Sequence, residues 1–548
     1  MNNIDIGIIV LFTLLVFICG MSFSKAGKNM KSYFSAGGAL PWWMSGLSLF
    51  MSFFSAGTFV VWGAIAYESG WVAISIQWTM CIAGIIIGLF IAPKWQKTKA
   101  MTAAEFITDR LGYRTQKIYT YLFLLISIFT MGAFLYPVAK IVEVSTGIPI
   151  NVSIISIGIL ILLYTSVGGL WAVIVTDVLQ FVVLTAVVLI VVPLSFDKIG
   201  GVDAFISKAP DTFFQFVNEE YSPLFLVAFG LYNLFFIAGN WAYVQRYTSV
   251  ATPKDAKKVG WLFAGLYAVS PLIWMLPPMI YRVLNPELSG LANEGAYLLM
   301  CKEVLPVGML GLMLGGMIFA TSSSVNTTLN ISAGVLANDV YKHFRPNTTD
   351  EGLVKIGKLA TIILGIITIL IALFVPYFGG IVEVVMTLAA LTGGAMFLPP
   401  LWALFSKKQT GTSILSVTLI SLAINAFFKF LGPTVLDLKL DRASEMGLGV
   451  GVPIVLLLCY EFYLTVNFSE NKQYEAYTAQ VAGKLVIVED TTSTDNKRGT
   501  RVIGIGIAVT GLIILILSFI AATGAMMVGI MGVVVASLGS IITYKSLK

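Results

Sequence analysis

The sequence predicts an all-α membrane protein that crosses the bilayer many times, and three observations lead to this fold class. Only 11% of the 548 residues are charged and 57% are hydrophobic, whereas soluble domains carry about 25% charged residues. The mean hydropathy is +0.89, and apolar stretches long enough to span a bilayer recur along the chain. Basic residues gather in alternate intervals between these stretches.

Fifteen apolar stretches predict transmembrane helices, because a helix of about 20 apolar residues spans the hydrocarbon layer. The first is predicted to be retained, since no basic residue precedes it and no small-residue cleavage site follows it. The stretches run over residues 6–21, 41–66, 71–92, 118–142, 150–165, 170–192, 224–243, 259–281, 305–336, 359–377, 381–405, 414–430, 448–466, 502–520 and 525–542.

The basic residues predict an odd number of crossings, with the amino terminus outside and the carboxyl terminus inside. Short cytoplasmic loops collect Lys and Arg, and in this orientation 26 of the 34 basic residues fall inside and seven outside. The remaining one, Lys140, lies within a stretch. It is three residues from Glu143, so we expect an ion pair between them on one helical face.

The composition also excludes several classes of protein. With a single histidine and scattered cysteines, the chain lacks ligand sets for zinc, haem or a disulfide framework. It has no P-loop and no H-E-x-x-H motif, which argues against an ATP-driven pump and against an enzyme. The net charge of +6 is spread over many intervals, so no nucleic-acid partner is expected. No required protein partner is evident.

Polar residues interrupt two of the apolar stretches, and such intervals usually line a cavity in membrane proteins. In the stretch 41–66, hydroxyl side chains recur mostly at intervals of three or four residues and so share one helical face. Glycines in the same stretch offer points at which the helix can break. The hydroxyl-bearing residues are Ser45, Ser48, Ser52, Ser55 and Thr58.

The stretch 305–336 contains seven polar side chains between Thr321 and Thr328. One interpretation is a helix interface at which small hydroxyls permit close approach. The other is a cation site, because hydroxyl and carbonyl oxygens are the ligands that a small hard cation such as sodium prefers. In the second interpretation, Ser323 and Ser324 point towards the carbonyl of Ala320.

Four further polar residues lie within apolar stretches. Asp177 is costly in a membrane, which favours a role in cation binding or coupling. The alternative is an acid at the cytoplasmic end of its helix, solvated or paired with a base. Asn233 and Asn240 are seven residues apart and share a face, and Gln77 lies in mid-stretch. These amides either join helices or, with the hydroxyl face of stretch 41–66, bind a polar solute.

Three motifs relate the chain to known proteins. They are Y-T-S-V-G-G-L-W-A-V-I-V-T-D-V-L-Q over residues 164–180, Y-N-L-F-F-I-A-G-N-W-A-Y-V-Q-R over residues 232–246, and the segment 320–341, which ends L-A-N-D-V-Y. On these motifs, residues 29–408 resemble the sodium/solute symporter family, which includes sodium-coupled sugar, sialic acid, proline, iodide and monocarboxylate transporters.

The resemblance implies a LeuT-like core of two inverted five-helix repeats, at 41–194 and 222–406. In such a core the first helix of each repeat is broken, and solute and ion are held near the midplane. An extra helix and a cytoplasmic loop then occupy 1–40, and extra helices occupy 411–548. Within the latter, the polar cytoplasmic segment 467–501 is predicted to be a partly disordered linker.

The resemblance also implies the ion sites. The sodium site of the family falls on the carbonyls of Met51, Phe54 and Ala320 and on the hydroxyls of Ser323 and Ser324, which agrees with the oxygen cluster expected from spacing. A second sodium site of some members would involve Asp177, Ser323, Asn326 and Thr327. Two of its hydroxyl positions are changed here to Asn and Thr, so the resemblance leaves open whether one or two sodium ions bind.

The resemblance leaves the solute less defined. Asn233 matches the asparagine that binds sugar in sugar-transporting members. At the position of the tyrosine that serves as a gate in those members, this chain has Phe236. Members that bind sialic acid use hydroxyls and a glutamine like those here. At the position of their carboxylate-binding arginine, however, this chain has Thr130. A neutral sugar or polyol is therefore favoured over an anion. The candidate solute residues are Ser55, Thr58, Gln77, Asn233 and Asn240.

The expected function is sodium-coupled symport of a small polar solute into the cell. Sodium is the coupling ion, no other cofactor is expected, and the chain would lie in the lipid bilayer of the plasma (inner) membrane. A carboxylate or sialic acid symporter is the alternative within the family. A solute sensor of the same fold is an alternative of another class, although the sequence shows no output module.

Overall fold

The computed structural model describes residues 1–22, 40–100, 102–164, 170–341, 344–345, 347–467, 471–483 and 492–547. Every regular element in these residues is an α-, 3-10 or π-helix. Extended pairing is limited, within the same residues, to a bridge between Leu40 and Val250. The predicted all-α fold class is confirmed.

Eleven helices of the described residues are long and apolar enough to cross a membrane. A twelfth candidate is the pair α12 (Pro223–Gly239) and α13 (Trp241–Thr248), which is bent by 61° at a short break. The remaining predicted stretches correspond to shorter or interrupted helices. Fifteen crossings and the outside position of the amino terminus therefore stay predictions.

The first predicted repeat begins with an interrupted helix and continues with long ones. Helix α3 (Trp42–Met51) is followed, after a gap, by η2 (Thr58–Trp62) and α4 (Gly63–Ser69). The others are α5 (Val72–Ile86), η3 (Ile87–Ile91), α6 (Ala92–Lys97), α7 (Ala103–Leu111), α8 (Tyr113–Thr146), α9 (Ile150–Tyr164) and α10 (Leu170–Ile199).

The second predicted repeat also begins with an interrupted helix, the pair α12 and α13. Its other elements are α14 (Pro253–Trp274), α15 (Leu276–Leu284), η5 (Gly290–Gly295), α16 (Ala296–Val304), α17 (Met309–Val335), η6 (Leu336–Tyr341), α19 (Asp350–Phe374), η7 (Val375–Phe378), α20 (Ile381–Thr392), η8 (Gly393–Phe397) and α21 (Leu398–Phe405). Short helices α11 (Val202–Lys208) and η4 (Asp211–Phe214) join the two segments.

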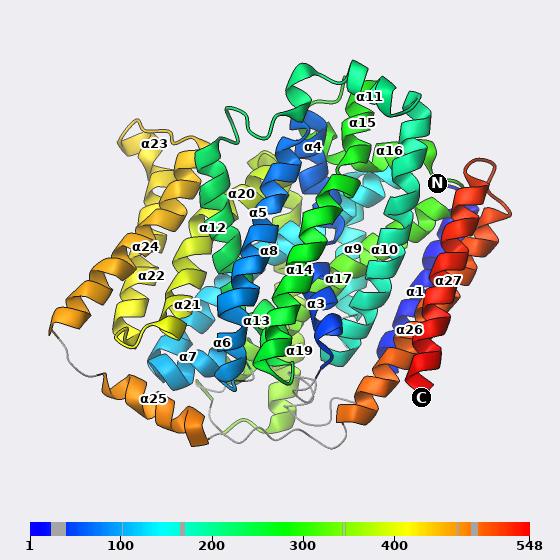
Figure 1. Ribbon diagram of the computed structural model, residues 1–548. Helices are drawn as coiled ribbons and strands as arrows, with labels where there is room; N and C mark the ends of the chain where they lie inside the picture. Colours follow the sequence, from blue (N-terminus) through cyan, green and yellow to red (C-terminus); the bar gives the residue numbers. More distant parts are fainter. Residues whose placement is uncertain are drawn as a thin grey trace.

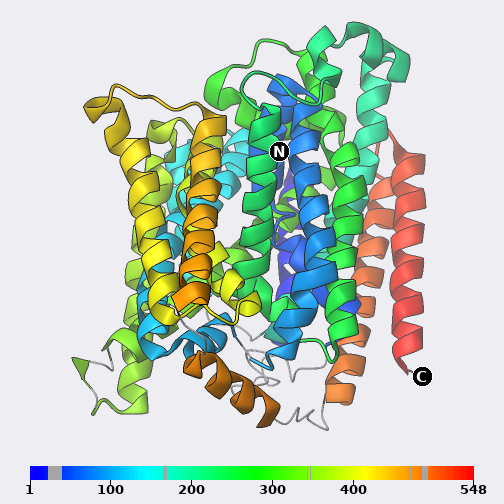
Figure 2. The same ribbon diagram turned by 60° about the vertical axis from the view of Figure 1, so that its left-hand side comes forward.

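Extra helices flank this core on two sides (Figures 1 and 2). On one side lie α1 (Asn3–Met21), α26 (Thr492–Ser518) and α27 (Ala525–Leu547), with α1 and α26 contacting α10. On the opposite side lie α22 (Gly411–Ala426), η9 (Phe427–Leu431), α23 (Gly432–Val435) and α24 (Arg442–Asn467). Helix α25 (Lys472–Gly483) crosses one end of the bundle and lies within the predicted linker 467–501.

The gap after α3 is held open by its own side chains. In a continuous helix the Ser55 amide would donate to the Met51 carbonyl, but it donates to Thr58 Oγ1 at 3.2 Å. The Thr58 hydroxyl in turn donates to the Phe53 carbonyl. Ser and Thr side chains that bond to nearby backbone groups compete with helix formation in this way.

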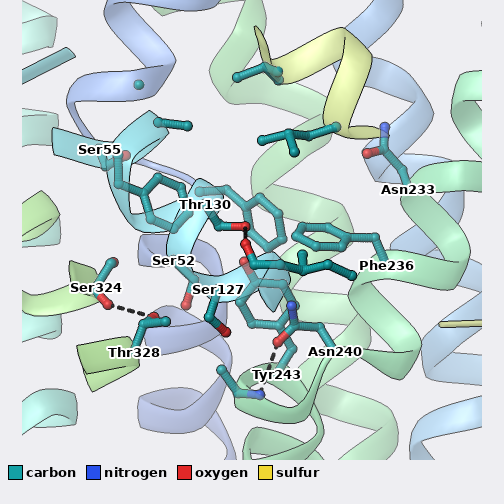
Figure 3. Close-up of a pocket in the computed structure, with 18 of the residues that line it drawn as sticks. Ser52, Ser55, Ser127, Thr130, Asn233, Phe236, Asn240, Tyr243, Ser324 and Thr328 are labelled. Carbon is teal, nitrogen blue, oxygen red and sulfur yellow. Dashed lines mark hydrogen bonds between the residues drawn. The ribbon is translucent and has the colours of Figure 1, made fainter. Parts of the chain in front are cut away.

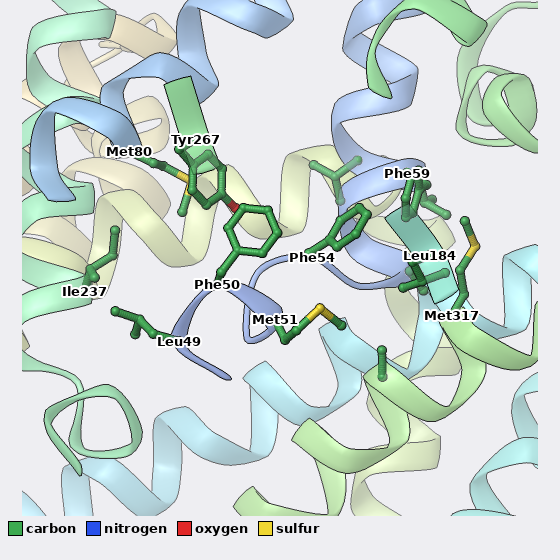
Figure 4. Packing of buried hydrophobic residues seen from close by; sticks show 14 of the residues in the cluster. Leu49, Phe50, Met51, Phe54, Phe59, Met80, Leu184, Ile237, Tyr267 and Met317 are labelled. Atoms are coloured by element: carbon green, nitrogen blue, oxygen red, sulfur yellow. The ribbon is translucent and has the colours of Figure 1, made fainter. Parts of the chain in front are cut away.

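Aromatic packing fixes the position of the same gap (Figure 4). Phe50 stacks on Trp274 with ring centroids 5.8 Å apart, and Phe54 contacts the same indole at 4.5 Å. Phe59, beyond the gap, contacts Phe54 at 5.4 Å. All four side chains are buried, so the irregular segment is surrounded by rigid apolar groups rather than by lipid.

Two of the 26 basic residues that fall inside in the predicted orientation, Arg110 and Arg246, are buried in the protein. Arg110 donates to the carbonyls of Ser406 and Gln409, and Arg246 is only 4% exposed. Both lie on helices that pack into the bundle, α7 and α13, so they are not solvated loop residues. The predicted pair of Lys140 and Glu143 is confirmed at 2.8 Å.

Candidate functional site

A cavity of about 240 Å³ lies between the two interrupted helices and α8, α17 and α20 (Figure 3). Aromatic rings make up much of its wall, among them Trp62, Phe123, Phe134, Phe229, Tyr232, Phe236, Trp241, Tyr243, Tyr267 and Phe397. Its smaller polar residues are Ser52, Ser55, Thr58, Ser127, Thr130, Asn233, Asn240, Ser324, Thr328 and Thr392. The charged residues of the wall are Asp177 and Arg246.

The gap after α3 lies directly against α17. The Ala56 amide donates to Thr321 Oγ1 at 3.1 Å, which joins the irregular segment to the polar cluster of α17. Ser324 Oγ lies 3.5 Å from the Ala320 carbonyl. Met51 is the last residue of α3 and Phe54 lies in the gap. All five predicted sodium-binding residues therefore lie, by their backbone, on two adjoining segments.

Some predicted ion-site side chains lie outside the described part of the chain. Ser323, the fifth predicted sodium-binding residue, belongs to α17 by its backbone, and so do Asn326 and Thr327 of the second predicted site. The structure describes their helix but not their side chains. Their roles stay predictions.

Asp177 belongs to a buried network of charged and hydroxyl groups. Ser48 Oγ donates to Asp177 Oδ2 at 2.6 Å and accepts from Nε and Nη2 of Arg246, each at 3.3 Å. Arg246 also donates from Nη1 to the Ala242 carbonyl at 2.8 Å. A single hydroxyl thus links an acid of α10 to a base of α13, and the two charges offset each other.

Asn233 is oriented by a partner on α5. Its Nδ2 donates to Thr79 Oγ1 at 2.8 Å, and Thr79 donates to the Ile76 carbonyl at 2.6 Å. Because the amide nitrogen is engaged, the carbonyl oxygen of Asn233 is directed into the cavity (Figure 3). It is an acceptor suited to a hydroxyl group of a solute.

The side chains of Asn240 and Thr58 form hydrogen bonds to the backbone at the two helix interruptions. Asn240 is the N-cap of α13, where its Oδ1 accepts from the Ala242 amide at 3.0 Å. Thr58 holds the gap after α3. Both also line the cavity, as does Ser55.

Gln77 differs from the other predicted solute residues. It does not line the cavity; its side chain is 1% exposed. Neither Nε2 nor Oε1 finds a hydrogen-bond partner among the residues that the structure describes. A contact between Gln77 and a solute stays a prediction.

Comparison with known proteins now decides the family. The sequence model of the Sodium:solute symporter family matches residues 33–420, which include both interrupted helices and α17. The chain belongs to this family. It is a multi-pass membrane protein of a plasma-membrane family of sodium-coupled symporters that transport small solutes, and it is not an enzyme.

Two relatives and one solved structure show how far the similarity extends. The sodium/glucose cotransporter of Vibrio parahaemolyticus is 28% identical over 79% of this chain and 86% of its own length. The sodium/sialic acid symporter SiaT of Proteus mirabilis is 28% identical over 75% of this chain and 86% of its own length. A Na⁺-coupled sialic acid symporter in a substrate-bound outward-open state covers 86% of this chain and 99% of its own, with 23% identity and a TM-score of 0.70. Its fold, of the LeuT type, is therefore shared.

In the symporter, Phe236 belongs to α12 and its ring faces the gap after α3; its role as a gate stays a prediction. Its ring stacks on Tyr232 at 5.4 Å and meets Phe53 at 6.2 Å edge to face. It also contacts Phe397 of η8 at 5.2 Å. The ring thus bridges the gap after α3, helix α12 and the interruption between α20 and α21.

Some residues of the cavity, such as Ser127, were not named from the sequence. Ser127 shares a face of α8 with Thr130, the position of the arginine in sialic acid members, and this face points into the cavity (Figure 3). Phe123 and Trp241 stack face to face at 4.7 Å and join α8 to the start of α13. The resemblance had related Thr130 to a solute-binding position, but nothing in the sequence distinguished Ser127 from a residue of a helix interface.

Proposed function

We propose that the chain is a secondary active symporter that imports a small neutral polar solute, with a sugar or polyol favoured, by alternating access. One observation carries this proposal. The irregular segment after α3 contributes to the cavity through Ser52 and Ser55 and contacts the polar cluster of α17 through Ala56. Solute and ion would therefore share one flexible piece of backbone.

Sodium is proposed to bind the carbonyls of Met51, Phe54 and Ala320 and the hydroxyls of Ser323 and Ser324. Neutral oxygens suit a monovalent cation that must bind and then leave. A cation held there would fix the gap against α17 and so complete the solute-binding wall. Each ligand then raises the affinity for the other, which is the thermodynamic content of coupling.

The charges of the cavity support a neutral solute. Asp177 and Arg246 offset each other through Ser48, and the remaining polar lining is hydroxyl, phenol and amide. A carboxylate solute would have to compete with Asp177 for the guanidinium. Hydroxyl groups could bond to Asn233 and Ser127, while the aromatic rings cover the apolar faces of a sugar.

The same network favours one sodium ion per cycle. A second ion would need Asp177 as its anionic ligand, together with Asn326 and Thr327. In this chain the positive charge near Asp177 is already provided by Arg246, and a second cation there would face repulsion at short range. We therefore propose a single sodium site.

Uptake into proteoliposomes with an imposed sodium gradient tests this function. Labelled sugars, polyols, carboxylates and amino acids form the panel, and potassium replaces sodium in the control. Uptake that does not respond to this replacement would contradict sodium coupling. Preferred uptake of sialic acid or another carboxylate would favour the alternative solute class, and binding without transport would indicate a sensor.

A further inference from the structure

The amino-terminal helix α1 packs against α17, the helix that carries Ala320 and Ser324. The two helices run in the same direction, since Asp5 of α1 lies beside Gly311 and Phe12 lies beside Gly315. A Cβ atom at Gly311 would come within 2.3 Å of the Asp5 carbonyl oxygen. The small residues of this G-x-x-x-G pair therefore permit a close approach of the two backbones.

Asp5 is the single charged residue of α1 and is 4% exposed. Its Oδ1 accepts hydrogen bonds from the amides of Gly308 at 2.8 Å and Gly311 at 3.2 Å. Its Oδ2 accepts from the Asn2 amide at 3.0 Å. One carboxylate thus satisfies amides at the N-termini of both helices.

This arrangement has a clear energetic basis. The first amides of a helix lack intrahelical partners and carry the positive end of the helix dipole. A buried carboxylate between two such ends is stabilised by both, and it opposes sliding of α17 along its axis. Ala320 lies nine residues beyond Gly311, about 14 Å along the same rigid helix.

We propose that Asp5 is a positioning residue for the sodium site, which acts by fixing the axial position of α17 against the gap after α3. This inference rests on the proposed function. Sodium coordination tolerates errors of only a few tenths of an ångström in oxygen position, so a small shift of α17 would weaken ion binding. The solute-binding wall on α8 and α12 would be unaffected.

The test compares Asp5→Asn with the wild-type protein in proteoliposomes. The sodium concentration at half-maximal uptake is expected to rise by about two- to fivefold, the range that a charge at a helix N-terminus typically contributes. The KM for solute at saturating sodium should stay within twofold of wild type. Asp203→Asn, the same change at an exposed residue of α11, is the control and should alter neither value.

A second pair of variants leaves the carboxylate in place. Gly315→Ala crowds the contact between α1 and α17, because its Cβ would lie 3.3 Å from the Phe12 ring and that ring must shift by a few tenths of an ångström, whereas Gly334→Ala on the same helix enters open space. The sodium midpoint should rise in the first and not in the second. Unchanged midpoints in Asp5→Asn and Gly315→Ala, or equal shifts in sodium and solute constants, overturn the inference. Wild-type uptake without sodium dependence would instead overturn the proposed function.

Discussion

At the scale of single residues, most polar groups that line the cavity of this symporter are uncharged hydroxyls and amides. Ser324, Asn233 and the hydroxyls of the gap after α3 line the cavity, and the buried charges nearby, Asp177 and Arg246, are linked through the Ser48 hydroxyl. Neutral ligands bind a cation weakly enough for release. This chemistry suits a transporter better than a permanent metal centre.

Ser324→Ala removes one of the five proposed sodium ligands. A hydrogen bond or ligand contact to a charged group contributes about 1.5–3 kcal/mol, so the sodium midpoint for uptake should rise at least about tenfold. Sodium-dependent uptake measures this directly. Ser322→Ala is a matched control, because its hydroxyl donates to the Ile318 carbonyl at 2.6 Å and does not line the cavity. An unchanged midpoint in Ser324→Ala would remove Ser324 from the site.

Asn233→Ala removes the proposed acceptor for a solute hydroxyl. The KM for solute should rise about tenfold, since an unpaired polar group in a binding site costs about 1–3 kcal/mol, and the sodium midpoint should stay within twofold. Thr79→Val, which leaves Asn233 without its orienting partner, should show a smaller effect in the same direction. Full transport by Asn233→Ala combined with Gln77→Ala would dispose of this solute site.

The sequence predicted the polar residues that are unusual within a membrane, but it did not predict which way their side chains point. Ser55, Thr58, Asn233, Asn240 and Ser324 all line the cavity. It missed the link between Asp177 and Arg246, because a base at the end of an apolar stretch has the same pattern whether it meets water or a buried acid. Gln77 could not be oriented, because apolar residues occur around the whole of α5 and their pattern does not identify the cavity side.

At the scale of elements, interruptions position the site, and they arise from local chemistry. The serines and glycines of stretch 41–66 predicted the gap after α3. The 61° break at Asn240 was not predicted from composition, because Asn240 was interpreted as a solute or interface residue. An asparagine in extended conformation whose side chain accepts an amide two residues on is an N-cap, and only coordinates distinguish these roles.

Glu294 of η5 joins two elements beside the cavity. It accepts from the amide of Ile381, at the start of α20, at 2.8 Å, and from the Tyr136 hydroxyl of α8 at 2.9 Å. Gly380 has φ +91°, and a Cβ there would come within 2.4 Å of Glu294 Oε1. This close contact holds the carboxylate against the start of α20.

Burial raises the pKa of the Glu294 carboxyl above its ordinary value. The folded protein therefore keeps this proton to higher pH than the unfolded chain, and stability falls as pH rises from the ordinary value through the raised one. Glu294→Gln should remove that part of the pH dependence in thermal unfolding. Glu294→Ala should cost about 1–3 kcal/mol at every pH, because the Ile381 amide loses its acceptor. The same pH slope in Glu294→Gln and wild type would contradict this assignment.

At the scale of the whole molecule, hydropathy predicted the helices but not their arrangement. Helix α1 and the span Val173–Ile199 of α10 each contain an 18-residue window with a mean hydropathy of 2.6, yet 28% of the first window and 61% of the second is buried. Lipid tails and protein cores are equally apolar, so the hydropathy of a helix does not show whether it contacts lipid or other helices. The positions of α1, α26 and α27 beside the core therefore needed the structure.

The stoichiometry of transport is the property of the whole molecule that the Asp177–Arg246 network predicts. With one sodium ion and a neutral solute, each cycle moves one positive charge. A potential of 100 mV contributes about 2.3 kcal/mol per charge, and a tenfold sodium gradient about 1.4 kcal/mol. Together these support a solute ratio of roughly 500-fold, whereas two sodium ions would support roughly 300,000-fold.

The two values can be separated in proteoliposomes in which potassium and valinomycin set the potential and the sodium gradient is fixed. The solute ratio at which net flux vanishes is then measured at several potentials. One sodium ion predicts a tenfold change in that ratio for about every 60 mV, and two predict a hundredfold change. The steeper dependence would mean that a second cation binds despite Arg246, and liposomes without a sodium gradient isolate the contribution of the potential.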